Sequence, residues 1–206
     1  MPWRLVGMLG LMVGCAGVPR VGAAPPVVKD AEAEKAYQGV VQHFSNHAEV
    51  YDVFDTHLFS ATTFQSLAFR EARVRRKGMF QATPEATLEG DLLKERQEFG
   101  ESVEFLFGAS VNGPQYDDFD TRTTHWRMSL HTDAGEVTPT SIERIGRADL
   151  NLRAYYPYLG DYWVAYRVKF PAKLANGQPV LSGEEQMLTV VVASTFGKAE
   201  LKVPAE

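Results

Sequence analysis

Cysteine is nearly absent from this sequence, since the 206 residues contain only Cys15. A lone cysteine forms no intramolecular disulfide, and sites that need several thiolates, such as thiolate zinc and iron–sulfur centres, are excluded. Long hydrophobic runs are lacking as well. The apolar run over residues 5–18 is shorter than the roughly 18–20 residues that span a bilayer. We therefore expect no permanent transmembrane helix and a domain stabilised by burial of its core.

The sequence also lacks the motifs of common enzymes. It contains no G-x-S-x-G, H-E-x-x-H, P-loop or G-x-G-x-x-G pattern. Strong positive charge is missing too, because the formal net charge is −5 at pH 7. An acidic balance argues against nucleic acid as a partner. These absences favour a non-catalytic protein that binds no nucleic acid.

The N-terminal residues have the organisation of an export signal. Arg4 precedes the apolar run, and a Pro-Arg pair ends it. Residues 11–15, Leu-Met-Val-Gly-Cys, resemble the lipobox of bacterial lipoproteins, which predicts removal of residues 1–14 as a signal peptide and a lipid on Cys15. The alternative is an ordinary cut after Ala23, which follows small residues. We expect an exported protein of the bacterial cell envelope, periplasmic or surface-facing and anchored to a membrane by lipid.

The composition then changes twice before the strands begin. Residues 15–30 are rich in Gly, Ala and Pro, which predicts a flexible tether. Residues 31–206 are expected to form a single domain. Its first element is a helix over 31–45, and a helical insert spans 64–100. In the second helix of the insert, Thr83 is expected to be the N-cap, with proline at the first helical position.

The rest of the chain alternates apolar and polar residues with period two, which predicts strands. The fold class is α+β, mainly β. We expect a seven-stranded antiparallel immunoglobulin-like sandwich, with a two-helix insertion after the first strand and an N-terminal helix. A partly open barrel is the alternative. The strands are expected at 57–63, 103–111, 126–130, 137–145, 164–170, 188–193 and 199–203, with a short helix at 149–155.

Five short motifs stand out beyond residue 45. They are Phe54-Asp55-Thr56, Asp118-Phe119-Asp120, Trp126-Arg127, Tyr156-Pro157-Tyr158 and Tyr166-Arg167-Val168-Lys169-Phe170-Pro171. This combination resembles a group of exported bacterial proteins, described as lipoproteins, that has no assigned activity. The resemblance covers most of the chain after about residue 45. It implies export and a single domain, and it implies no mechanism and no site residues.

An internal repeat supplies candidate metal ligands. The hexapeptide YDVFDT at 51–56 recurs as YDDFDT at 116–121. If the two loops converge, their carboxylates would offer the oxygen ligands that Ca²⁺ prefers. Alternatively, the Asp and Thr side chains close turns while the aromatic rings pack underneath. The candidate ligands are Asp52, Asp55, Asp117, Asp118 and Asp120.

Six aromatic residues crowd into residues 155–166. Sugar rings stack on exposed aromatic faces, so such a cluster in an envelope protein predicts contact with a glycan or a protein partner. The candidate contacts are Tyr158, Tyr162 and Trp163. The alternative is rigid packing at a corner of the sandwich, with the hydroxyl groups bonded to nearby backbone.

A basic cluster lies near the end of the first insert helix, which is predicted over residues 66–77. It consists of Arg70, Arg73, Arg75, Arg76 and Lys77. Cations at a helix C-terminus are stabilised by the helix dipole, which is sufficient to explain them. Contact with anionic lipid headgroups is the functional alternative.

Together these features predict a non-catalytic envelope lipoprotein module that binds or scaffolds an unknown envelope protein or glycan. It holds no cofactor in this interpretation. The alternatives are an exported hydrolase that takes its acid–base pair from the Asp-rich loops, and a calcium-dependent binding protein that uses the same loops.

Overall fold

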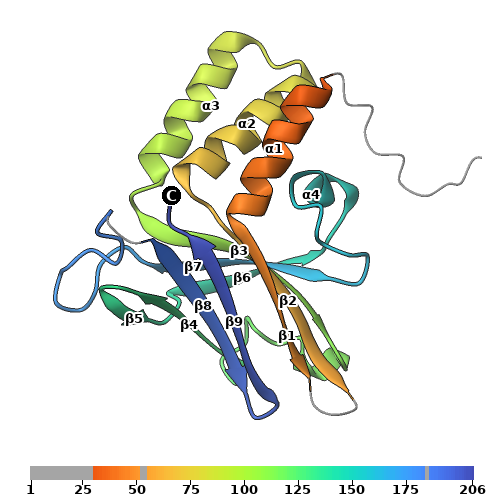
Figure 1. The fold of residues 1–206 in the computed structure, drawn as a ribbon, viewed down its shortest axis with the longest axis vertical. Helices are drawn as coiled ribbons and strands as arrows, with labels where there is room; N and C mark the ends of the chain where they lie inside the picture. Colours follow the sequence, from red (N-terminus) through yellow and green to blue (C-terminus); the bar gives the residue numbers. More distant parts are fainter. Residues whose placement is uncertain (1–29, 52–54, 184–185) are drawn as a thin grey trace, which may run out of the picture.

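The computed structural model describes residues 30–51, 55–183 and 186–206. These residues form two antiparallel sheets and a few helices, so the domain is α+β and mainly β, as the alternation predicts. Figure 1 shows helices α1 to α3 in a layer across one end of the strands. The elements are α1 Ala31–His43, β1 Ser45–Tyr51, β2 Thr56–Phe64, α2 Leu67–Gln81, α3 Glu85–Glu98, β3 Ser102–Val111, the 3₁₀ turn η1 Pro114–Tyr116, β4 Arg127–Thr132, β5 Gly135–Val137, β6 Ser141–Arg147, α4 Leu150–Tyr155, β7 Val164–Pro171, β8 Met187–Ser194 and β9 Gly197–Pro204.

Each sheet joins strands that are distant in sequence. The five-stranded sheet has the order β1-β2-β3-β7-β6, and the four-stranded sheet has the order β5-β4-β8-β9. The chain therefore crosses between the sheets after β3, after β5 and after β7. Only the tertiary structure shows these crossings, because the local sequence pattern of a strand does not predict which other strand it pairs with.

The core lies between the two sheets. The side chains of Phe105 and Phe107 of β3 point into this core, and so does that of Tyr166 of β7. Leu188 of β8 and Leu201 of β9 meet them from the other sheet. Because successive side chains of a strand point to opposite faces, each strand keeps one face for the core and one for the outside. We call the face directed away from the other sheet the outer face.

The edge strands β1 and β9 of the two sheets lie side by side. Asn46 Nδ2 donates a hydrogen bond to the backbone oxygen of Lys202 at 2.6 Å. His43 Nε2 lies 2.7 Å from the backbone oxygen of Glu206. Residue 43 contacts residue 206 and residue 46 contacts residue 202, so the residue numbers rise along one edge as they fall along the other. The two edges therefore run antiparallel. Each edge thereby shields the other from pairing with a second chain.

The expected count of seven strands is wrong, because the described residues contain nine. β1 was not expected, because the sequence pattern predicts a first helix that continues to residue 45, whereas α1 ends at His43. The predicted strand 137–145 is two strands, of which β5 pairs with β4 and β6 pairs with β7. Pro139 lies between them, and proline has no N–H for a ladder. The helical insert therefore follows the second strand.

The two insert helices form close to their predicted positions. The hydroxyl group of Ser66 accepts a hydrogen bond from the backbone N–H of Phe69, which caps α2. Ala82 ends this helix in the left-handed region, with φ of 50°. Thr83 does not cap α3. Pro84 occupies the N-cap position, without a side-chain hydrogen bond.

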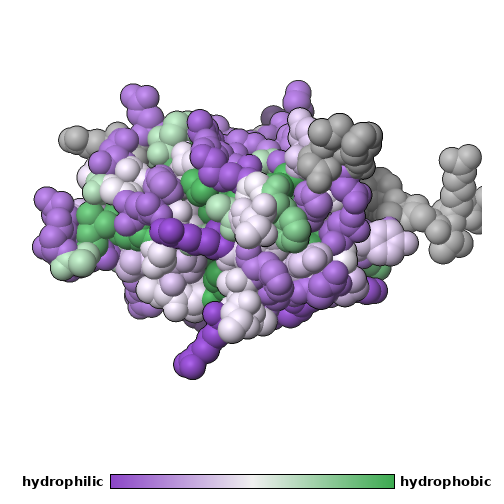
Figure 2. Space-filling view, turned by 90° about the horizontal axis from the view of Figure 1, so that it is seen from below, coloured by the Kyte–Doolittle hydropathy of each residue, from purple (hydrophilic) through white to green (hydrophobic). Residues whose placement is uncertain are grey.

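The end of the domain opposite the helices is closed by loops. Figure 2 shows this end covered mainly by hydrophilic and neutral residues, with small hydrophobic areas between them. The 112–126 segment between β3 and β4 contributes the buried rings of Phe119 and Trp126 to the core. Their rings are stacked, with centroids 5.5 Å apart. The second copy of the repeated hexapeptide therefore anchors a loop by burying its phenylalanine.

Candidate functional site

The segment between α4 and β7, residues 156–163, folds over the outer face of the five-stranded sheet. It lies on a row of small residues, since Ala61, Gly108 and Ala165 are register partners across β2, β3 and β7. A Cβ atom on Gly108 would overlap the side chain of Leu159 and would lie 3.1 Å from Trp163 Cε3. Only glycine at this position lets the segment approach the sheet so closely.

Replacing Gly108 with alanine is expected to lower the free energy of unfolding by about 1–3 kcal/mol, because the new methyl group overpacks this contact. Chemical denaturation measures the change. The control is Gly90→Ala on α3, where a Cβ would meet nothing within 4 Å. That change should stabilise the domain by about 0.5–1 kcal/mol, through better helix propensity. A Gly108→Ala variant as stable as the unsubstituted protein would contradict the packing argument.

A chain of hydroxyl groups runs from this segment to β1. Tyr158 Oη lies 2.6 Å from Thr63 Oγ1, and Thr63 Oγ1 lies 2.7 Å from Ser45 Oγ. Burial raises the pKa of Tyr158 well above its ordinary value, with the bond to Thr63 acting in the opposite direction. The phenol therefore stays neutral. Because either atom of each pair can donate, Ser45 at the end of the chain can offer a donor or an acceptor.

A groove of about 750 Å³ opens beside this chain of hydroxyl groups. The end of α1, the outer face of β1 and β2, and the 156–163 segment form its walls, and we call it the aromatic groove. Its apolar lining includes Phe59, Pro157 and Trp163. No lysine or arginine lines it among the described residues. The polar residues in its lining are Gln42, Ser45, Asn46, His47, Glu49, Ser60 and Tyr158.

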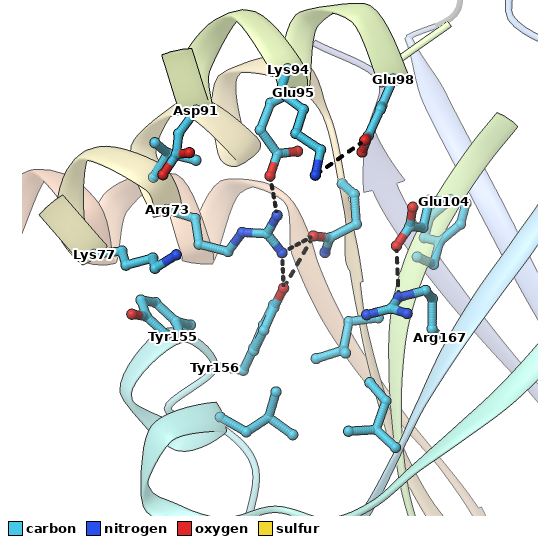
Figure 3. Close-up of a pocket in the computed structure, with 16 residues that line it drawn as sticks. Arg73, Lys77, Asp91, Lys94, Glu95, Glu98, Glu104, Tyr155, Tyr156 and Arg167 are labelled. Atoms are coloured by element: carbon cyan, nitrogen blue, oxygen red, sulfur yellow. Dashed lines mark hydrogen bonds and ion pairs between the residues drawn. The ribbon is translucent and has the colours of Figure 1, made fainter. Parts of the chain in front are cut away.

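A second pocket, of about 370 Å³, lies between α2, α3, α4 and the outer face of β3 and β7. Figure 3 shows Arg73 at its centre, bonded to Glu95 and close to the hydroxyl group of Tyr156. The bond from Arg73 Nη2 to Glu95 Oε1 is 2.8 Å long. Across the pocket, Arg167 Nε lies 3.2 Å from Glu104 Oε1. We call this the charged pocket.

Arg70 joins two of the carboxylates that line the charged pocket. Its Nη1 lies 3.0 Å from Glu95 and its Nη2 lies 2.9 Å from Glu104, while Nε donates to the backbone oxygen of Gln65. The side chain of Arg70 is only 6% exposed. Buried charges require such partners, because an unpaired charge is expensive to remove from water. We therefore assign this network to joining the helical layer to the sheet.

The explanation of the basic cluster through the helix dipole is wrong for this helix. α2 continues to Gln81, so the cluster does not lie at its end, and its last turn has no basic residue. Arg70 and Arg73 belong to the network above. Arg76 is paired with Glu34 of α1, and its guanidinium lies 4.3 Å from the ring centroid of Tyr37. Most of the cluster therefore serves internal packing.

The Asp-rich loop at 116–121 uses its carboxylates in internal bonds. Asp117 accepts hydrogen bonds from Tyr166 and Arg144. Asp118 accepts from the hydroxyl group of Thr124 at 3.1 Å and from the backbone N–H of His125 at 3.0 Å. The bonds of Asp118 lie within its own loop, whereas those of Asp117 join the loop to β6 and β7.

The other described calcium candidates also contact polar or basic neighbours, and Asp120 shares Arg144 with Asp117. Asp55 accepts a hydrogen bond from Asn112 Nδ2 at 3.2 Å, and Asp120 lies 3.9 Å from Arg144. Asp52 lies outside the described residues. Within the described ranges, no three His, Cys, Asp or Glu side chains are grouped so that they could hold a metal ion. The calcium site stays a prediction.

One serine and histidine pair invites comparison with hydrolases. Ser129 Oγ lies 3.0 Å from His131 Nε2 on the outer face of the four-stranded sheet. Glu136 Oε1 lies 3.8 Å from the same nitrogen atom. A catalytic triad needs the acid on the other ring nitrogen, where it orients the imidazole. This arrangement does not form a triad.

The structure brings together two of the three predicted glycan contacts. Tyr158 and Trp163 both line the aromatic groove, whereas Tyr162 is 82% exposed and lies outside it. Sequence reasoning missed His47, Glu49 and Phe59, which complete the groove from β1 and β2. The alternation of Ala48 and Val50 with polar residues was the available signal for β1.

The predicted anchor lies outside the described residues. Cys15, the signal peptide and the tether to residue 29 all fall there. The described chain begins at Asp30, whose carboxylate accepts hydrogen bonds from the backbone N–H groups of Glu32 and Ala33 and caps α1. Among the helices that the structure describes, none combines the length and apolarity needed to cross a bilayer.

Comparison with known proteins gives one distant structural similarity. No protein-family profile matches the sequence, and no curated protein sequence matches it significantly. The fold is similar to a crystal structure of a protein of unknown function from Burkholderia pseudomallei. The TM-score is 0.41 and the sequence identity 8%, and the alignment covers 84% of each chain. A similarity of this size carries no information about function.

Proposed function

We propose that this protein is an exported, lipid-anchored module of the bacterial cell envelope, which binds another envelope component through the aromatic groove without catalysing a reaction. The groove is the observation that carries the proposal. Its volume of about 750 Å³ lies within the range of about 300–1,000 Å³ that is usual for binding pockets. Its lining combines aromatic rings with polar groups that could fix the orientation of a ligand.

The proposed anchor fits the position of the groove. A tether from Cys15 to Asp30 would reach at most about 50 Å when extended. It would join the domain at the start of α1, whereas the groove is lined by Val41 and Gln42 near the end of the same helix. A lipid anchor would therefore hold the domain near a membrane and leave the groove accessible.

Metabolic labelling tests the anchor. Cells that produce the full chain are grown with radioactive palmitate, and the protein is recovered by immunoprecipitation. We expect label in the unsubstituted protein and none in a Cys15→Ala variant, because the acylated thiol is then missing. Equal labelling of both proteins, or of neither, would refute the lipid anchor and leave the binding part to be judged by crosslinking.

Photo-crosslinking in cells tests the binding part. A photoreactive amino acid replaces Gln42, which lines the aromatic groove, or Lys198 on the outer face of the other sheet as the matched control. We expect an adduct with another envelope component from position 42 and none from position 198. Equal adducts from both positions would indicate random encounters and would contradict a role for the groove.

A further inference from the structure

We infer that the aromatic groove takes an uncharged saccharide chain, an inference that rests on the proposed function and names its ligand class. Charge is the first argument. Among the described residues of the lining, Glu49 is the only acidic residue and His47 is the only histidine. An anionic ligand would meet the carboxylate of Glu49 with no lysine or arginine in the lining to pair with it. The lining therefore selects against phosphorylated or acidic polymers.

The hydrogen-bonding groups of the groove provide the second argument. The amide of Gln42 and the imidazole of His47 each carry a donor and an acceptor, and the hydroxyl group of Ser45 can serve as either. Sugar hydroxyl groups also donate and accept at the same atom. A lining of this kind matches a polyhydroxylated ligand in many orientations. An acyl chain would leave these polar groups unpaired, at a cost for each.

Exposed aromatic rings provide the third argument. Phe59 is 41% exposed on the outer face of β2, where Glu49 is its register partner. Trp163 contributes a second ring to the lining, from the 156–163 segment. The C–H face of a sugar ring is apolar, so it can cover such rings while its rim of hydroxyl groups meets polar neighbours. Aromatic and polar groups thus line the same hollow, as a saccharide requires.

Isothermal titration calorimetry on the purified full chain tests the inference. The uncharged probes are chitotetraose, cellotetraose and maltotetraose, and the anionic probe is tetragalacturonate. We expect saturable binding of at least one uncharged tetrasaccharide and none of the acidic one. Failure of all three uncharged probes, or tighter binding of tetragalacturonate, would overturn the inference.

Two substitutions locate the binding. Phe59→Ala and Gln42→Ala should each weaken binding of the responsive tetrasaccharide by about tenfold, the factor that corresponds to loss of one good contact. Tyr162→Ala is the matched control, since this exposed ring lies outside the groove and its loss should leave the affinity unchanged. Circular dichroism verifies that each variant is folded. Affinity unchanged by both groove substitutions would place the sugar elsewhere and contradict the inference.

The two proposals can fail separately. If no tetrasaccharide binds while position 42 still crosslinks to an envelope protein, the saccharide inference is wrong and the groove remains a binding site. If neither sugar binding nor a crosslink from position 42 is found, the proposed function fails together with the inference.

Discussion

Replacing Arg70 with alanine is expected to lower the free energy of unfolding by about 3–5 kcal/mol, the usual cost of removing one partner from a buried ion pair. Glu95 and Glu104, each with a side chain 17% exposed, would lose the cation that lies between them. Arg73 would still contact Glu95 and Arg167 would still contact Glu104, which places the expected effect near the lower limit. The helical layer would be loosened from β3.

Chemical denaturation of the full chain measures this effect, with Arg75→Ala as the control. Arg75 lies on the same helix but is exposed, so its loss should change stability by less than about 0.5 kcal/mol. If the two variants were equally stable, the network around the charged pocket would not join the helices to the sheet. The assignment of the buried cations to packing would then be wrong.

Replacing Phe119 with alanine should lower the free energy of unfolding by about 3–5 kcal/mol, because a buried aromatic ring is replaced by a cavity. The ring is 2% exposed. Its centroid lies 5.1 Å from that of Phe107, 5.5 Å from that of Trp126 and 5.3 Å from that of Tyr166. The substitution would therefore remove the contact through which the Asp-rich loop closes this end of the core.

Thermal and chemical unfolding measure the loss, and Arg122→Ala is the control. Arg122 lies three residues further along the same loop and is exposed, so its substitution should have little effect. A Phe119→Ala variant that lost less than about 1 kcal/mol would show that the loop is not held by its buried ring. The repeat would then need an explanation other than packing.

The period of the apolar residues was sufficient to predict most strands of the core. β3 and β7 form where Phe105, Phe107, Tyr166 and Val168 alternate with other residues, because alternate side chains of a strand must face one core. The same signal failed at residues 137–145. A strand that changes sheets keeps period two on both sides of the crossing, so β5 and β6 resemble one strand.

The aromatic half of the groove could be predicted and the other half could not. Tyr158 and Trp163 stand in a visible cluster of aromatic residues. Their partners His47 and Phe59 reach them only through the register of the five-stranded sheet. That register sets Ala61 beside Gly108, and Gly108 beside Ala165. A local sequence pattern does not predict which residues become neighbours across such separations in the chain.

The amino-acid sequence by itself determined the fold class, the insert helices and the exclusion of disulfide and thiolate chemistry, because composition and periodicity are local properties. The tertiary structure alone decided which charges are internal and which side chains line the groove. The cations of α2 resemble a surface cluster in the sequence, yet Arg70 and Arg76 are buried in ion pairs. Burial depends on what packs against a side chain, and those neighbours come from distant parts of the chain.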